Sequence, residues 1–132
     1  MGQLDFADDV LSRIRERAGR YNERAFLFVL AALEHLQGRL QVRRHVSGEE
    51  LAHACRDFAL EQYGLLSRTV LEHWGIRSTA DIGAIVFTLI DVGLLKAQDR
   101  DRLEDFEEVF AFRQAFEAEY PWGAWRQDAP LH

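Results

Sequence analysis

The most informative stretch of this sequence is Ala25-Phe26-Leu27-Phe28-Val29-Leu30-Ala31-Ala32-Leu33, because it contains no polar residue. The surrounding residues predict a helix from about 22 to 37 that stops at Gly38. A helix that is apolar on every side must be covered by other elements on several sides. We therefore expect residues 22–37 to form the central helix of the fold.

A second helix is expected ahead of it, with Asp5 as its N-cap and Gly19 at its end. Phe6, Val10 and Ile14 recur every four residues, which places them on one face of that helix. The two helices form a predicted N-terminal pair over residues 5–37.

The clearest local signal follows at Ser47-Gly48-Glu49-Glu50, which has the pattern of a capping box. The helix that it opens closes at Gly64, and further helices are predicted over 66–74 and 79–92. The last segment is rich in β-branched residues, which would suit a strand. Its length, its capping residues and its closing glycine favour a helix.

The pattern changes after Gly93. We expect a β-hairpin that pairs residues 94–98 with 109–112, and residues 40–46 are also strand-like. Phe106 and Phe110 have helical spacing, whereas Phe110 and Phe112 have strand spacing. The spacing therefore does not decide whether residues 103–112 form a helix or a strand. Residues 117–132 are expected to be an irregular aromatic tail.

Taken together, these elements predict a mostly α (α+β) fold. We expect one domain over residues 1–132, a helical bundle with a small β-hairpin. Its part from 40 to 116 follows the element order of a winged helix, a match of order alone that does not fix function.

The composition of the chain limits its class. The 132 residues include 16 basic and 22 acidic side chains, a net charge of −6, which is the wrong sign for binding nucleic acid by bulk charge. One cysteine, Cys55, excludes an internal disulfide framework. The N-terminus has no signal-peptide pattern, and no apolar run approaches the ~20 residues of a membrane span. We expect a soluble, cytoplasmic protein without a membrane segment.

Three blocks of sequence carry a resemblance to a known family. They are residues 45–51 (HVSGEEL), 74–83 (WGIRSTADIG) and 85–95 (IVFTLIDVGLL). In this order and spacing they resemble a small family of conserved hypothetical bacterial proteins first noted in Planctomycetes and Verrucomicrobia. The resemblance runs from about residue 6 to 116. It implies a similar length and fold, and it carries no activity, cofactor or site residue.

Nucleic-acid binding is the alternative that a winged helix would suggest. The third helix of that arrangement enters the major groove and presents basic or amide side chains to the bases. The segment 79–92 contains neither, and its carboxylates Asp81 and Asp91 would repel phosphates. The sequence therefore argues against a nucleic-acid partner.

Catalytic and metal-binding patterns are weak. Glu49 and His53 share a helical face at a spacing of four, which is typical of a solvated surface, and Cys55 lies on an apolar stripe. We expect no catalytic residue, metal or cofactor, and we do not expect an enzyme. An enzyme with an unrecognised metal site is the third hypothesis, since convergence of the histidines cannot be judged from sequence.

Charge is distributed unevenly along the chain. Residues 11–44 hold eight arginines against three carboxylates, and residues 99–120 hold three arginines against eight carboxylates. These segments attract each other within the fold, or the basic segment faces an acidic partner. We expect a non-catalytic protein-interaction or regulatory module, with a second copy of the chain as one candidate partner. The surfaces that we select are Arg13, Arg17, Arg43, Arg44 and the tail residues Trp122 and Trp125.

Overall fold

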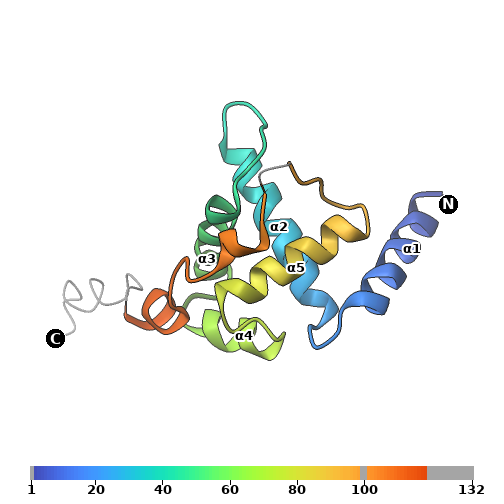
Figure 1. Ribbon diagram of the computed structural model, residues 1–132. Coiled ribbons are helices and arrows are strands. Elements are labelled where there is room, and N and C mark those ends of the chain that lie inside the picture. Colours follow the sequence, from blue (N-terminus) through green and yellow to red (C-terminus); the bar gives the residue numbers. More distant parts are fainter. Residues whose placement is uncertain (1, 99–100, 119–132) are drawn as a thin grey trace.

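Figure 1 shows the computed structural model, which describes residues 2–98 and 101–118, without the side chains of 2–8, 10, 117 and 118. The apolar stretch lies in α2 (Glu23–Arg39), which packs against α1, α3 and α5 and confirms the predicted central helix. Most of the stretch is buried, but Leu27 is 46% exposed, so one edge of α2 stays uncovered. Gly38 lies inside the last turn, and the helix ends one residue later than its predicted stop.

Helix α1 (Gly2–Arg17) begins before Asp5, so Asp5 is not its N-cap. Its buried residue Ile14 and the following Ala18 belong to the main core. Two arginines fix α1 to the end of α5: Arg17 pairs with Asp91 at 2.6 Å, and Arg13 donates to the carbonyl oxygen of Val92 at 2.5 Å.

The capping box is confirmed at the start of α3 (Gly48–Tyr63). The Ser47 hydroxyl accepts from the Glu50 amide at 3.1 Å, and the Glu50 carboxylate accepts from the Ser47 amide at 3.0 Å. A short turn, η1 (Gly64–Leu66), leads into α4 (Ser67–His73), and α5 (Thr79–Asp91) starts at the cap Ser78. The segment with β-branched residues is therefore a helix.

Asp81, predicted as an exposed acidic position on α5, is instead buried. Its carboxylate accepts from the Arg20 guanidinium, from the Tyr21 hydroxyl at 2.6 Å and from the Arg77 amide at 2.8 Å. This set of contacts, the Asp81 clamp, joins the α1–α2 turn to the start of α5. Because these donors neutralise and cover Asp81, it cannot act as the phosphate-repelling surface charge that we expected.

The predicted hairpin is wrong, because no β-strand occurs in the residues that the structure describes. The amides of Leu94 and Leu95 donate to the Leu89 carbonyl at 2.9 and 3.3 Å, and so they finish α5. The Val109 amide donates to the Thr79 hydroxyl at 3.2 Å. Backbone groups that a hairpin would pair with each other thus bond to α5 instead.

Residues 40–46 are not a strand either. The Gln37 side chain accepts from the Arg44 amide at 3.2 Å and donates to the Arg44 carbonyl at 2.6 Å. A single side chain thereby supplies the two hydrogen bonds that a strand partner would have supplied, and it holds the loop against α2.

Residues 103–112 are neither a strand nor a regular α-helix. They contain the 3₁₀ turn η2 (Leu103–Phe106), and the π-helical turn η3 (Gln114–Ala118) follows. The prediction of a mostly helical domain is confirmed, but the winged-helix arrangement loses the hairpin that would form its wing.

Phe106 connects this C-terminal part to the helices. A Cβ atom on Gly83 would lie 2.7 Å from the Phe106 Cβ, and one on Gly48 would lie 3.0 Å from its Cε2. Two glycines on α5 and α3 therefore make room for a ring that is only 3% exposed. The ring also forms part of the wall of the pocket described next.

Candidate functional site

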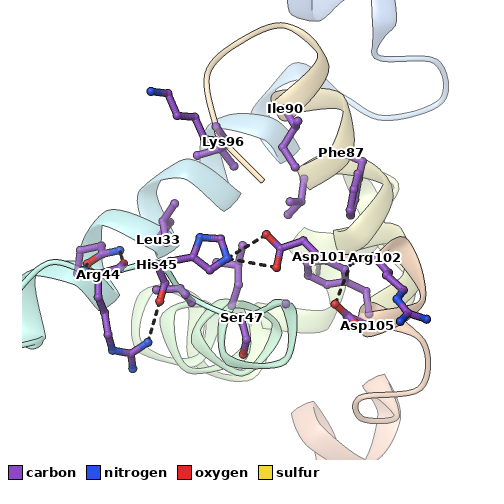
Figure 2. Close-up of a pocket in the computed structure, with 17 residues that line it drawn as sticks. Leu33, Arg44, His45, Ser47, Phe87, Ile90, Lys96, Asp101, Arg102 and Asp105 are labelled. Atoms are coloured by element: carbon purple, nitrogen blue, oxygen red, sulfur yellow. Dashed lines mark hydrogen bonds and ion pairs between the residues drawn. The ribbon is translucent and has the colours of Figure 1, made fainter. Parts of the chain in front are cut away.

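A pocket of about 200 Å³ opens between α2, the start of α3, α5 and residues 95–96 and 101–106 (Figure 2). Most of its wall is hydrocarbon, with a polar rim on the side of the 40–47 loop. The apolar lining residues are Leu33, Val46, Leu51, Val86, Phe87, Ile90, Leu95 and Phe106. We name it the His45 pocket, after the imidazole on its rim.

The end of α5 shapes one wall of the His45 pocket. Gly93 has a φ of +87°, and the amides of Gly93 and Leu94 donate to the carbonyls of Ile90 and Leu89 at 3.0 and 2.9 Å. This is the hydrogen-bond pattern of a Schellman motif, which turns the chain sharply at a glycine. The turn brings Leu95 back to the pocket beside Ile90.

The most specific polar contact of the pocket joins His45 to Asp101. The His45 Nε2 lies 2.9 Å from Asp101 Oδ2 and 3.2 Å from Oδ1, and the Gln98 amide donates to Oδ2 at 2.7 Å. Both side chains are largely covered, with exposed fractions of 26% and 19%. Because a carboxylate only accepts hydrogen bonds when it is ionised, Nε2 is the nitrogen that carries the proton.

Charges of both signs lie on the outer rim, where the carboxylates of Asp101 and Asp105 accompany three basic side chains. Arg44 pairs with Glu50 through contacts of 2.6 and 3.1 Å; its guanidinium, and secondly the Ser47 amide, lower the pKa of Glu50 from 4.5 to about 2. Lys96 and Arg102 also line the pocket, and their side chains make no ion pair with a carboxylate in the described part of the chain. Because Asp101 accepts from His45 and Gln98, and Asp105 accepts from the Arg102 amide, the side chains of Lys96 and Arg102 are the rim groups that can bind a negatively charged group.

The structure divides the predicted arginine surface into two parts. Arg44 lines the pocket, and its neighbour Arg43 pairs with Glu34 at 2.6 Å. Arg13 and Arg17 lie instead beside the last turn of α5, whose residue Ile90 faces the pocket. Trp122 and Trp125 lie outside the described residues.

Within the described part of the chain, these arginines do not pair with the acidic segment. The ion-pair partners of the four arginines are Asp9, Asp91, Glu34 and Glu50, none of which belongs to the acidic segment 99–120. His45, the residue directly after the basic segment, is the one that pairs with Asp101 of the acidic segment.

The other sequence candidates stay apart from the pocket. His53 Nε2 lies 4.0 Å from Glu49, and its ring packs on Phe110 with centroids 5.6 Å apart. Within the described side chains, no three potential ligands converge on a metal position. Cys55 is fully buried, and burial raises its pKa to about 12, which keeps the thiol protonated at neutral pH.

The sequence did not reveal the pair of His45 and Asp101. The two residues are 56 positions apart, and no local pattern links them. The available signal was the position of His45 two residues before the N-cap Ser47, because the start of a helix fixes the backbone that leads into it.

Comparisons with family models, curated proteins and solved structures find no match for this chain. The resemblance to a bacterial family therefore stays a prediction, and the function must be argued from the geometry. Of the helices in the described residues, none combines the length and the apolar character that a membrane crossing needs.

Proposed function

We propose that the protein is a non-catalytic interaction module and that the His45 pocket receives an anchor side chain from an acidic segment of a protein partner. The observation that carries this proposal is the combination of an apolar pocket with two rim cations, Lys96 and Arg102, that have no ion-pair partner among the described residues. Interfaces concentrate their binding energy in a few apolar or aromatic residues that fill such pockets, surrounded by polar contacts.

The size of the pocket supports a single anchor. An engineered apolar cavity of about 150 Å³ binds benzene. The His45 pocket, at about 200 Å³, has room for one ring-sized group and few further atoms. This volume suits one side chain better than a large cofactor.

The surrounding charge supports an acidic partner. Lys96 and Arg102 line the pocket, and the pair of Arg43 with Glu34 is about two-thirds exposed on both sides. Exposed ion pairs contribute only about 0–1 kcal/mol each, so an arginine can exchange one carboxylate for another at small cost. Complementary charge would also steer the encounter and make it depend on salt.

We place this module in the cytoplasm, where its single cysteine would stay reduced. A second copy of the chain is one source of an acidic segment, because residues 99–120 carry a net charge of −5 in the sequence. Sedimentation over a range of protein concentrations distinguishes this source from a different protein.

The test is a selection from a displayed peptide library, followed by fluorescence anisotropy of the enriched peptides. We expect acidic peptides with one apolar or aromatic anchor to bind the wild type. Ile90→Trp fills the pocket and should abolish binding, whereas Leu27→Trp adds the same ring on the exposed edge of α2 and should leave it intact. Enrichment that does not differ between the two variants would contradict the proposal.

The same anisotropy experiment tests the nucleic-acid alternative. A labelled duplex titrated at several salt concentrations should show no saturable binding. Tight binding that weakens steeply with salt would instead favour a nucleic-acid partner. Stoichiometric zinc or iron in freshly purified protein would favour the enzyme hypothesis.

A further inference from the structure

We propose that the group recognised inside the His45 pocket is a phenol, whose hydroxyl donates a hydrogen bond to Nδ1 of His45. This inference rests on the proposed function, because it names the chemistry of the anchor that the pocket receives. The juxtaposition that carries it is a half-buried imidazole, with one nitrogen already occupied, on the rim of a ring-sized apolar cavity.

The first step is the tautomer of His45. Nε2 faces the Asp101 carboxylate at 2.9 Å and donates to it, so the neutral imidazole has its lone pair on Nδ1. Figure 2 shows one ring nitrogen of His45 toward Asp101 and the other on the opposite edge of the ring. Within the described residues, Nδ1 has no hydrogen-bond donor. In this tautomer the site presents an acceptor that a ligand can satisfy.

The second step is the state of the other polar groups. The Gln37 amide is used by both backbone groups of Arg44, and the Ser47 oxygen accepts from the Glu50 amide. The Asp101 carboxylate already accepts from His45 and from Gln98. The Asp105 carboxylate, which also lines the pocket, accepts from the Arg102 amide at 3.1 Å. Nδ1 of His45 differs from these groups because it is an acceptor without any donor among the described residues.

The third step is the shape of the remaining space. Leu33, Phe87 and Ile90 line the same pocket as the imidazole, from α2 and α5, and all three present hydrocarbon (Figure 2). A ligand that fits must combine a flat apolar body with one donor at its edge. A six-membered aromatic ring with a hydroxyl meets both conditions, and it fills a cavity somewhat larger than the ~150 Å³ that holds benzene.

The matched probes are p-cresol, the side-chain analogue of tyrosine, and toluene, which lacks only the hydroxyl. We expect NMR titration of the wild type to give chemical-shift changes around the pocket, with p-cresol bound about tenfold more tightly than toluene. In His45→Phe the two probes should bind with equal affinity. Ile90→Trp should bind neither probe, and circular dichroism verifies that each variant is folded.

A second measurement covers the case in which His45→Phe does not fold. The ¹⁵N resonance of unprotonated Nδ1 in wild-type protein should move upfield when p-cresol is added and stay in place with toluene. Equal affinity of the two probes for the wild type, or an unchanged Nδ1 resonance, would overturn the phenol assignment while the apolar pocket stands. Failure of every probe and of the library peptides would overturn the proposed function as well.

The source of the phenol is tested separately. An acidic peptide with one tyrosine is compared with the same peptide carrying phenylalanine. A preference for tyrosine, lost in His45→Phe, assigns the phenol to a protein partner. If p-cresol shows its preference but neither peptide binds, the phenol is a free small molecule, and the recognised chemistry is the same.

Discussion

Two glycines set the position of one aromatic ring in this protein. Gly48 and Gly83 lie on different helices, and a Cβ atom on either would be 3.0 Å or closer to an atom of Phe106. Glycine inside a helix ordinarily costs about 0.5–1 kcal/mol relative to alanine. Here the loss is offset by the burial of a phenylalanine that joins η2 to both helices.

Gly83→Ala should therefore destabilise the protein by about 1–3 kcal/mol, because the added methyl overlaps Phe106 and the core must shift. The matched control is Gly38→Ala, also within a helix, where a Cβ meets no atom within 4 Å. That variant should gain about 0.5–1 kcal/mol. Urea unfolding of both variants checks the pair of predictions. Equal effects at the two positions would refute the packing argument.

Glu50 makes the stability of the fold depend on pH. Its pKa in the folded protein is about 2, below its ordinary 4.5, so the ionised form stabilises the folded state. This contribution is fully present above pH 4.5 and is lost as the pH falls from 4.5 toward 2. Because the side chain is partly exposed, we expect about 1 kcal/mol after allowing for solvent screening.

The measurement is urea unfolding of wild type and Glu50→Gln across this pH range. Glutamine keeps the capping box but does not titrate. The difference in the free energy of unfolding between the two proteins should therefore shrink as the pH is lowered. A difference that is constant with pH would show that Glu50 makes no charge-dependent contribution.

At the scale of elements, two carboxylates of α5 attach this helix to α1 and to the turn after α1, and the two differ in how exposed they are. Asp81 is 7% exposed at its side chain and Asp91 is 68% exposed, and each pairs with an arginine from the end of α1 or the turn after it. Burial decides how much each contact contributes to the free energy of unfolding. When the acceptor of a buried contact is removed, its donors are left with neither water nor a partner.

Asp81→Ala should lower the free energy of unfolding by about 2–4 kcal/mol, since it removes the acceptor of Tyr21 and of the Arg77 amide. Asp91→Ala, the matched exposed position, should cost at most about 1 kcal/mol. Thermal and urea unfolding of the two variants give the comparison. Similar losses would mean that the Asp81 clamp does not hold α1 and α2 to α5.

The elements that were predicted correctly are those with local signals. Ser47 with Glu50, Ser78 and the glycines at 64 and 93 define helix ends through contacts only a few residues apart, and the structure confirms them. The hairpin prediction was wrong because the backbone groups that would have paired in it bond to α5 instead, and the partner of Val109 lies 30 positions away in the sequence. The hydroxyl of Thr79 and the end of α5 bond to the backbone that a strand partner would have used.

At the scale of the whole molecule, the core forms a continuous cluster from α1 to η3, with Cys55 at 0% exposure inside it. Burial raises the pKa of Cys55 to about 12, so both access and ionisation oppose its reaction. We expect a thiol reagent such as DTNB to leave the native protein unmodified at neutral pH and to label it fully in urea. The labelling rate in native buffer should follow the free energy of global unfolding across the variants above. Fast labelling without denaturant would show local opening of α3.

The candidate site belongs to this largest scale, which explains why the sequence only partly indicated it. Arg44 was selected from its charge, and it lines the pocket. The pair of His45 and Asp101 and the wall formed by Phe106 depend on four elements that meet in space. No periodicity within one segment contains that information, because each residue alone is ordinary for its local structure.

The close fit of Phe106 against two glycines has a consequence for sequence divergence. Positions 48, 83 and 106 share one small volume, so their substitutions should be correlated among descendants of the same ancestor. A lineage that acquired alanine at position 83 is expected to carry a smaller residue at 106, and the smaller residue should come first, since a vacated space is tolerated before it is refilled. Substitutions at this part of the pocket wall would thus occur in pairs, whereas residues on the exposed edge of α2 could be substituted independently.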